Sequence, residues 1–265
     1  MSDQRHAIVE KEGHLLTVTL NRPEARNAFS PEMLVGMYDA WRQLDADDEL
    51  RVAILTGAGG HFCAGADLKT MHGEQTPPDL KKRFDEVPEL HWQALLRHKR
   101  PQKPIIAAVE GYAVAGGTEI LQATEIRVAS ESARFGVAEV RWSLFPVGGS
   151  TVRLRRQIPF TRAAEILLTG QQLSAAEALS IGLIGRVVPE GEALAEARKI
   201  ADVIAANGPL AVRAIMRSLR ETEGLSEEEG LARELEIGLP VFASEDAREG
   251  PRAFAEKRKP NFKGR

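Results

Sequence analysis

Short runs of apolar residues, separated by stretches with helical character, most strongly constrain what this chain can fold into. The runs are residues 51–57 (RVAILTG), 104–109 (PIIAAV) and 126–129 (IRVA), and residues 133–137 are a candidate fourth. Strands that are apolar along their whole length are typical of a sheet covered by helices on both faces, and alternation with helices favours parallel pairing. The pattern therefore predicts an α/β fold with a mostly parallel sheet.

The first fifty residues predict a hairpin followed by a helix. Residues 7–10 and 15–20 are rich in Val, Ile, Leu and Thr, and Glu12-Gly13 between them suits a turn. A helix is then expected to begin at Ser30-Pro31-Glu32, with serine as N-cap and proline at the first helical position. Its apolar face would consist of Leu34, Met37, Tyr38, Trp41 and Leu44.

Beyond about residue 174 the sequence turns predominantly helical. Helices are expected over 192–207, 209–223 and 227–241, and capping boxes are expected at Ser174 to Glu177 and at Ser226 to Glu229. We therefore expect two regions. Residues 1–190 would form an α/β core that holds the active site, and residues 191–265 would form a helical region used for oligomerisation and for contact with the ligand.

Composition excludes several classes of protein. The 265 residues carry 35 Lys and Arg against 38 Asp and Glu, a net charge of −3, so a dedicated nucleic-acid binder is not expected. The one cysteine, Cys63, cannot form an internal disulfide, which favours a reducing compartment. The N-terminus lacks an apolar signal segment, and no apolar run approaches the roughly 20 residues that span a bilayer. A cytoplasmic protein without membrane partners is the expectation.

Three loops that contain glycine follow the apolar runs: residues 57–66, 111–117 and 148–149. None matches the glycine patterns of dinucleotide or nucleoside-triphosphate sites. Such loops can instead expose backbone N–H groups to an anion or a developing oxyanion, and Gly116-Gly117 directly precede a helical stretch. A second donor could come from the segment 64–67. The glycines could also serve only to make tight turns.

Two glutamates lie near these loops in the sequence. Glu119 falls in the first helical turn after Gly117, and Glu139 follows Phe135-Gly136. Addition of water to an activated double bond needs one group that takes a proton from water and another that delivers a proton to carbon. Ordinary roles, at a helix N-terminus for Glu119 and on the surface for Glu139, stay open. The six histidines show no metal-ligand spacing, so no metal is expected.

The whole chain resembles the crotonase (enoyl-CoA hydratase/isomerase) family. Five stretches in the same order carry the resemblance, namely 20–29 (LNRPEARNAF), 61–69 (HFCAGADLK), 109–119 (VEGYAVAGGTE), 135–149 (FGVAEVRWSLFPVGG) and 249–263 (EGPRAFAEKRKPNFK). The resemblance implies a crotonase-like ββα spiral core with a C-terminal helical trimerisation region. It also implies an acyl-CoA thioester substrate and no cofactor, since CoA is part of the substrate.

The resemblance assigns roles to individual residues. The N–H groups of Ala66 and Gly116 would hold the thioester oxygen as an oxyanion hole, and Glu119 and Glu139 match the two glutamates of the hydratases. Retention of both acids favours an enoyl-CoA hydratase, which adds water across the trans-2 double bond to give 3-hydroxyacyl-CoA.

Further residues match the segments of the family that bind CoA or substrate: Glu24, Ala25, Arg26, Ala64, Asp67, Leu68, Lys69 and Gly117. Phe254 and Lys257 in the tail match residues that reach the CoA adenine and phosphates, often from a neighbouring subunit. The expected assembly is a homotrimer or a homohexamer built as a dimer of trimers.

The chain departs from the family pattern at a few positions. Ala115 stands where many members have a third glycine, and the bulky Trp142 and Phe145 replace small residues after Glu139. We expect Trp142 to reshape the acyl pocket or its rim. The segment 71–89 is predicted to be a long polar loop over the acyl group. Together these features favour a long or bulky acyl chain, in β-oxidation of fatty acids or of other acyl-CoA compounds.

Two other functions remain open at the level of sequence. One is isomerisation of a Δ3 to a Δ2 enoyl-CoA, which needs one acid rather than two. The other is a catalytically silent crotonase-like binding protein, in which the acids and donor positions would be expected to have decayed.

Overall fold

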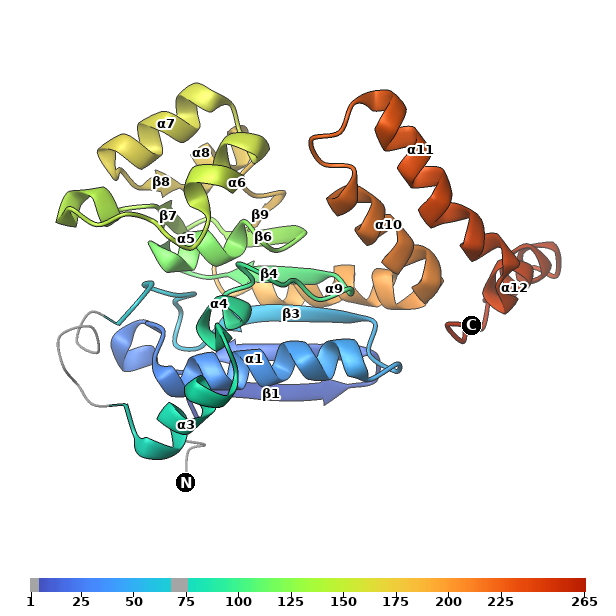
Figure 1. Ribbon diagram of the computed structural model, residues 1–265, viewed down its shortest axis with the longest axis horizontal. Coiled ribbons are helices and arrows are strands. Elements are labelled where there is room, and N and C mark those ends of the chain that lie inside the picture. Colours follow the sequence, from blue (N-terminus) through green and yellow to red (C-terminus); the bar gives the residue numbers. More distant parts are fainter. Residues whose placement is uncertain (1–4, 68–75) are drawn as a thin grey trace.

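A six-stranded sheet forms the centre of the molecule, whose computed structural model describes residues 5–67 and 76–265. The strand order is β1 (Ala7–Glu12), β2 (Leu15–Leu20), β3 (Val52–Gly57), β4 (Ile105–Val109), β6 (Ile126–Ser130) and β9 (Arg186–Val188) (Figure 1). Only the β1–β2 hairpin is antiparallel, and every other pair in this sheet is parallel. The predicted hairpin and the mostly parallel sheet are confirmed.

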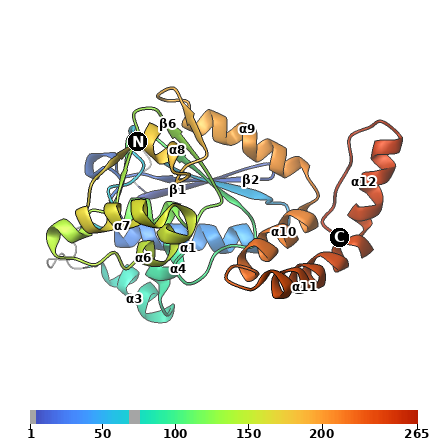
Figure 2. The ribbon, with the colours of Figure 1, turned by 90° about the horizontal axis from the view of Figure 1, so that it is seen from above.

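Both faces of this sheet are covered by helices, as apolar strands require. Leu16, Val18 and Leu20 of β2 pack into the core that contains helix α1 (Pro31–Ala46), whereas Leu15 joins the core formed with helix α9 (Ala193–Ala206). Figure 2 shows α1 and α9 on opposite sides of the sheet. The short helix α4 (Leu90–Ala94) packs beside α1.

Helix α1 begins where the sequence predicts. The Ser30 hydroxyl accepts a hydrogen bond from the Met33 N–H at 3.2 Å, and Pro31 occupies the first turn. At the other end Lys103 Nζ donates to the carbonyl oxygens of Leu44 and Asp47, each at 2.7 Å. A cation at that end stabilises the helix because the last carbonyls have no partner within it.

A second, three-stranded sheet consists of β5 (Tyr112–Val114), β7 (Arg134–Gly136) and β8 (Leu173–Ser174). The predicted strand at 133–137 therefore exists as β7, but it belongs to this small sheet and not to the large parallel one. Strands β5, β8 and β9 were not predicted. Each has only two or three residues, too few for a period to show.

Short helical elements connect the two sheets and the loops around them. They are η1 (Pro23–Ala25), α3 (Pro78–Glu86), α5 (Gly116–Leu121), η2 (Glu139–Trp142), α6 (Ser150–Gln157), α7 (Phe160–Thr169) and α8 (Ala175–Ser180). The prediction of a continuous loop over 71–89 is wrong for its second half, because α3 begins at Pro78, where proline suits a first helical turn. Residues 71–75 lie outside the described part.

Three helices extend beyond the sheet at the C-terminal end: α10 (Pro209–Glu221), α11 (Glu227–Gly238) and α12 (Glu245–Ala255), with η3 (Leu239–Ala243) before α12 (Figures 1 and 2). The capping boxes predicted at Ser174 and Ser226 are both present. The division near residue 190 stays a prediction. Helix α9, which follows that position, packs on the large sheet. None of the helices in the described ranges is long and apolar enough to cross a membrane.

Candidate active site

Two loops that follow the central strands β3 and β4 of the large sheet touch each other. A Cβ atom placed on Gly65 would lie 2.8 Å from the Ala115 Cβ and 2.9 Å from the Gly116 nitrogen. Any larger residue at position 65 would therefore force the loops apart. The contact places Gly116, at the N-terminus of α5, next to Gly65 and hence close to Ala66.

The N–H groups of Ala66 and Gly116 are available to a ligand. Among the hydrogen bonds of the described residues, neither N–H has an acceptor. Gly116 is the first residue of α5, where the N–H has no partner within the helix. Ala66 pairs with Phe29 as an isolated bridge, and the hydrogen bonds are made by its neighbours: Phe29 N–H donates to Gly65 O at 2.8 Å and Asp67 N–H donates to Phe29 O at 3.3 Å.

Close packing fixes the backbone around Gly116. A Cβ atom on Gly117 would lie 2.3 Å from the Cys63 carbonyl oxygen, so only glycine fits there. Ala115 has φ 50° and ψ −127°, a backbone conformation that residues other than glycine rarely adopt. The departure from the family pattern at Ala115 thus coincides with a strained residue directly before a donor.

Glu119 is buried, and both of its carboxylate oxygens are hydrogen-bonded. Oε2 accepts from the Gly148 N–H at 3.0 Å, and Oε1 accepts from the Ser150 N–H at 3.1 Å. Ser150 opens α6, so the carboxylate lies at the N-terminus of that helix. Gln122 Nε2 in turn donates to the Ser150 hydroxyl at 2.8 Å. Glu119 therefore acts as an acceptor held in one orientation.

Glu139 occupies a different environment at the start of η2. Its Oε2 atom is buried and has no hydrogen-bond partner among the described residues. Burial raises the pKa of Glu139 from its usual 4.5 to about 7, and the nearby charge of Glu119 adds to that effect. Near neutral pH a large fraction of Glu139 is thus a neutral carboxylic acid.

The Thr118 hydroxyl joins the two segments that carry these acids. It donates to the Ala113 carbonyl at 2.5 Å and accepts from the Gly136 N–H at 3.0 Å, and the Ala115 N–H donates to Gly136 O at 2.7 Å. No motif in the sequence marks Thr118 as part of the site. The sequence does indicate a loop at Gly148-Gly149, but it does not indicate the hydrogen bond from Gly148 to Glu119.

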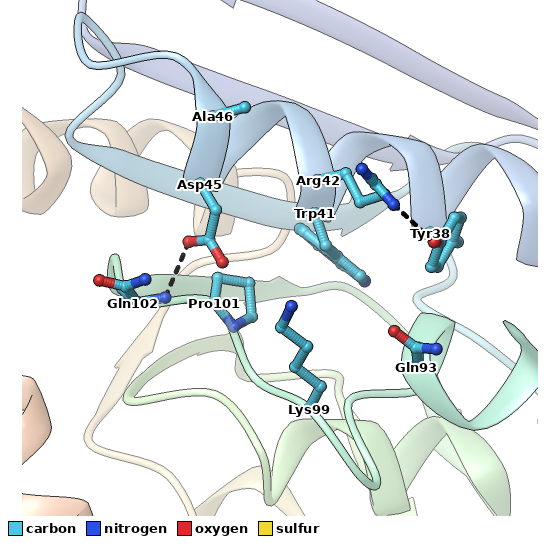
Figure 3. A pocket seen from close by; sticks show the side chains of 9 residues that line it. All are labelled: Tyr38, Trp41, Arg42, Asp45, Ala46, Gln93, Lys99, Pro101 and Gln102. Carbon is cyan, nitrogen blue, oxygen red and sulfur yellow. Dashed lines mark hydrogen bonds between the residues drawn. The ribbon is translucent and has the colours of Figure 1, made fainter. Parts of the chain in front are cut away.

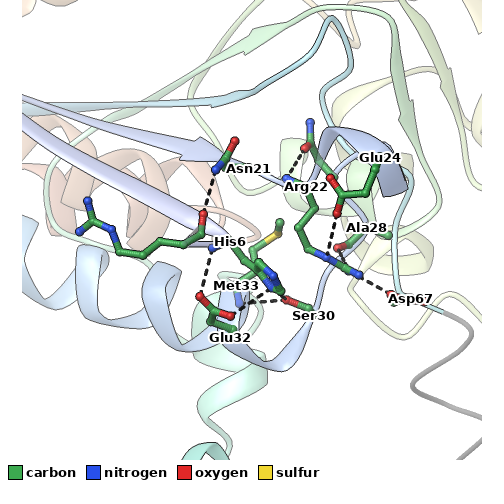
Figure 4. Close-up of polar contacts among 11 residues, drawn as sticks. His6, Asn21, Arg22, Glu24, Ala28, Ser30, Glu32, Met33 and Asp67 are labelled. Carbon is green, nitrogen blue, oxygen red and sulfur yellow. Dashed lines mark hydrogen bonds and ion pairs between the residues drawn. The ribbon is translucent and has the colours of Figure 1, made fainter. Parts of the chain in front are cut away.

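Several predicted CoA-binding residues lie at or beside the segment 64–67. The Arg26 carbonyl accepts from the Ala64 N–H at 3.0 Å, and the Arg26 guanidinium stacks 5.2 Å from the centre of the Tyr112 ring. Glu24 and Ala25 belong to η1, directly before Arg26. The Asp67 carboxylate is paired with Arg22 at 2.9 Å (Figure 4). Leu68 and Lys69 lie outside the described residues.

Other predicted residues are not brought to this place within one chain. Phe254, with 87% of its surface exposed, lies on α12, and Lys257 follows it, on the side of the molecule opposite to α5 (Figure 1). Trp142, at the end of η2, is 73% exposed and so does not fill a pocket of its own chain.

Two further features stand apart from this chemistry. Burial raises the pKa of the Cys63 thiol to about 12, so it is a structural side chain and not a nucleophile.

A surface cavity of about 320 Å³ lies between α1 and residues 93–102 and contains none of the predicted site residues (Figure 3). It is lined by Tyr38, Trp41, Arg42, Asp45, Ala46, Gln93, Lys99, Pro101 and Gln102. The described residues form no cluster of His, Cys, Asp and Glu that could hold a metal.

Comparison with known proteins gives consistent matches over the full length. The model of the family described as enoyl-CoA hydratase/isomerase matches residues 10–265. Enoyl-CoA hydratase EchA19 of Mycobacterium tuberculosis is 58% identical over 98% of this chain and 97% of its own. (E)-Benzylidenesuccinyl-CoA hydratase of Thauera aromatica is 39% identical over 97% and 98%. The crystal structure of an enoyl-CoA hydratase from Mycobacterium tuberculosis superposes with a TM-score of 0.89 at 42% identity, covering 99% of this chain and 100% of the other.

Proposed function

The chain belongs to the enoyl-CoA hydratase/isomerase family, and we infer from its site that it is an enoyl-CoA hydratase. It adds water across the 2,3 double bond of an enoyl-CoA thioester and gives the 3-hydroxyacyl-CoA. The observation that carries this function is the pair of glutamates, one fixed by two N–H donors and one with a buried oxygen that has no partner among the described residues. They lie near two backbone N–H groups for which the described residues supply no acceptor.

The free N–H groups supply the first part of the mechanism. When water adds to the β-carbon, negative charge develops on the thioester oxygen as an enolate forms. We assign the Ala66 and Gly116 N–H groups as donors to that oxygen. Donors already in place need not reorganise during the reaction, and loss of one such donor typically costs about 3–4 kcal/mol of transition-state stabilisation.

The two glutamates supply the second part. Glu119 has both oxygens fixed as acceptors, and it is suited to take a proton from the attacking water. Glu139, whose pKa burial raises to about 7, keeps a proton near neutral pH and can deliver it to the α-carbon. Proton transfer by a positioned group typically contributes about 10²–10⁴-fold to the rate. After one turnover the proton has moved from Glu139 to Glu119, and exchange with solvent restores the starting state.

CoA would lie along the edge formed by Glu24, Ala25, Arg26, Ala64 and Asp67, with Leu68, Lys69 and Gly117 as further candidate contacts. Because α12 lies on the opposite side of the same chain, Phe254 and Lys257 could meet the CoA adenine and phosphates only from a neighbouring subunit (Figure 1). This supports a homotrimer or homohexamer in which one subunit completes the CoA site of the next.

A long or bulky acyl group is the substrate class that we propose. Trp142 and Phe145 are exposed next to Glu139, at 73% and 66%, and would form the rim over which the acyl chain leaves the site. The hydratase of Thauera aromatica, named for a ring-bearing acyl-CoA, is a relative at 39% identity. Comparison of kcat/KM for short, long and ring-bearing enoyl-CoA substrates tests this class, and a strong preference for a four-carbon chain would overturn it.

The function itself is tested by two substitutions. Glu119→Gln and Glu139→Gln keep the size of the side chains but remove the proton acceptor and the acid. Each should lower kcat for hydration by about 10²-fold or more, followed as the loss of the enoyl-thioester absorbance. Isomerisation of a Δ3-enoyl-CoA that survives in one of the two variants, with no hydration by the wild type, would instead indicate an isomerase.

A further inference from the structure

Arg22, between β2 and η1, has a largely buried side chain that contacts the segment 65–67, which carries the Ala66 donor. Its side chain is only 17% exposed, and that of Asp67, its partner, is 11% exposed. Arg22 Nη1 donates to Asp67 Oδ2 at 2.9 Å and also to the Ala28 carbonyl at 2.9 Å (Figure 4). Arginine is rarely so buried unless it is paired, and such a pair is well shielded from salt.

These two acceptors flank the bridge that orients Ala66. Ala28 directly precedes Phe29, and Asp67 directly follows Ala66, while Phe29 and Ala66 pair with each other. One nitrogen of Arg22 thus binds both strands of this parallel bridge, one residue before Phe29 and one residue after Ala66. The two backbone hydrogen bonds of Phe29, to Gly65 and from Asp67, hold the rest.

We propose that Arg22 is a positioning residue for the Ala66 N–H donor, acting through Asp67. The proposal rests on the proposed function, since Ala66 matters only where an oxyanion develops. It also gives the Asp67 side chain a different role from direct contact with CoA, because its carboxylate faces an arginine of its own chain. If the Arg22 contact is lost, the segment 65–67 loses the ion pair that connects it to the strand of Phe29, and the direction of the Ala66 N–H becomes less defined.

The test separates donor positioning from CoA binding. Arg22→Gln should lower kcat for enoyl-CoA hydration by about 10–10³-fold, up to the value of a lost oxyanion donor, while KM and the Kd for free CoA change less than about threefold. The carbonyl stretch of a bound, non-reacting acyl-CoA should shift toward its value in free solution, because one hydrogen bond to the thioester oxygen is weakened.

Arg220→Gln is the matched control. Arg220 lies on α10, away from the donors, and its side chain is 20% exposed. Like Arg22, it donates to one backbone carbonyl, that of Pro101, and to one carboxylate, that of Glu125 at 2.8 Å. It should lower thermal stability like Arg22→Gln and leave kcat and the carbonyl stretch unchanged. Arg22→Lys keeps the charge beside Asp67 and should restore part of kcat. It also serves as the test variant if Arg22→Gln does not fold.

Three results would overturn the proposal. The first is a wild-type kcat in Arg22→Gln, or in Arg22→Lys where Arg22→Gln fails to fold. The second is a rise in KM and in the Kd for CoA with no change in kcat, which would place Arg22 and Asp67 in CoA binding. The third is an unchanged carbonyl stretch. If instead the wild type hydrates no enoyl-CoA, the proposed function fails, and the carbonyl stretch of bound acyl-CoA still decides whether Arg22 orients the donor.

Discussion

Two carboxyl groups of the same chemical type take different parts in this site because their surroundings differ. Glu119 receives two backbone N–H groups, at the N-terminus of α6. Glu139 has one buried oxygen that no other described residue binds, and burial raises its pKa to about 7. A base and an acid can thus coexist near neutral pH within one site.

The position of the Glu119 carboxylate can be tested through Gly148. A Cβ atom at Gly148 would lie 2.5 Å from Glu119 Oε2, and the backbone there is not in the left-handed region. Gly148→Ala should therefore displace the carboxylate and lower kcat by about 10²-fold or more, with the Kd for CoA unchanged. Gly185→Ala, whose new Cβ would meet only a carbonyl oxygen at 3.7 Å, is the control. A wild-type kcat in Gly148→Ala would show that the carboxylate position is not critical.

At the scale of elements, helix α12 holds the end of the chain with two carboxylates. Asp246 accepts from the N–H groups of Lys263 and Gly264 at 2.7 and 2.8 Å, and Glu249 accepts from the Asn261 N–H at 2.9 Å. Hydrogen bonds from Arg258 and Asn261 hold the pKa of Glu249 well below its usual range. Hydrogen bonds to these two carboxylates, and not packing alone, thus fix residues 259–265 to α12.

Removal of these charges should release the tail. Asp246→Asn combined with Glu249→Gln should increase the rate at which a carboxypeptidase removes residues 259–265 by about tenfold, because local opening then needs less free energy. Glu245→Gln is the control, since the exposed Glu245–Arg265 pair contributes little. Equal digestion rates for the double variant and the wild type would contradict this account of α12.

Elements that carry a periodic or continuous apolar pattern could be predicted from the sequence. The β3 and β4 strands and helix α1 belong to this group, because burial fixes their composition. Strand β8 has two residues, and its pairing with β7 depends on tertiary structure. The contacts of the site are equally nonlocal: Glu119 binds N–H groups 29 and 31 residues away, and Arg22 binds Asp67 across 45 residues. The acids and donors could be named by resemblance, but the groups that hold them could not.

For the whole molecule, the outer surface of the C-terminal helices predicts self-association. Large apolar side chains there are strongly exposed in one chain: Leu231 57%, Leu235 59%, Leu239 56%, Phe242 78% and Phe254 87%. Several such residues on adjacent elements are typical of a surface that is covered by another protein. We expect a second copy of the chain to cover them, in line with the homotrimer or homohexamer proposed above.

Light scattering should therefore give three or six times the chain mass of 29.0 kDa. Leu235→Glu, which places a charge on the exposed apolar surface of α11, should shift the mass toward that of one chain and raise KM through loss of the neighbour's Phe254 and Lys257. Glu228→Gln on the same helix should leave the mass unchanged. A fully active wild-type monomer at micromolar concentration would contradict the shared site.

The central claim, that neutral Glu139 delivers a proton to the α-carbon while Glu119 accepts one from water, is tested most directly by the pH dependence of kcat/KM. Glu139 must be protonated in the free enzyme, so kcat/KM for hydration should fall as the pH rises through about 7, approaching a tenfold loss per pH unit. Dehydration should follow the same profile, because the overall reaction neither takes up nor releases a proton. A kcat/KM that stays constant or rises between about pH 6 and pH 9 would show that Glu139 works in its ionised form and would contradict the account.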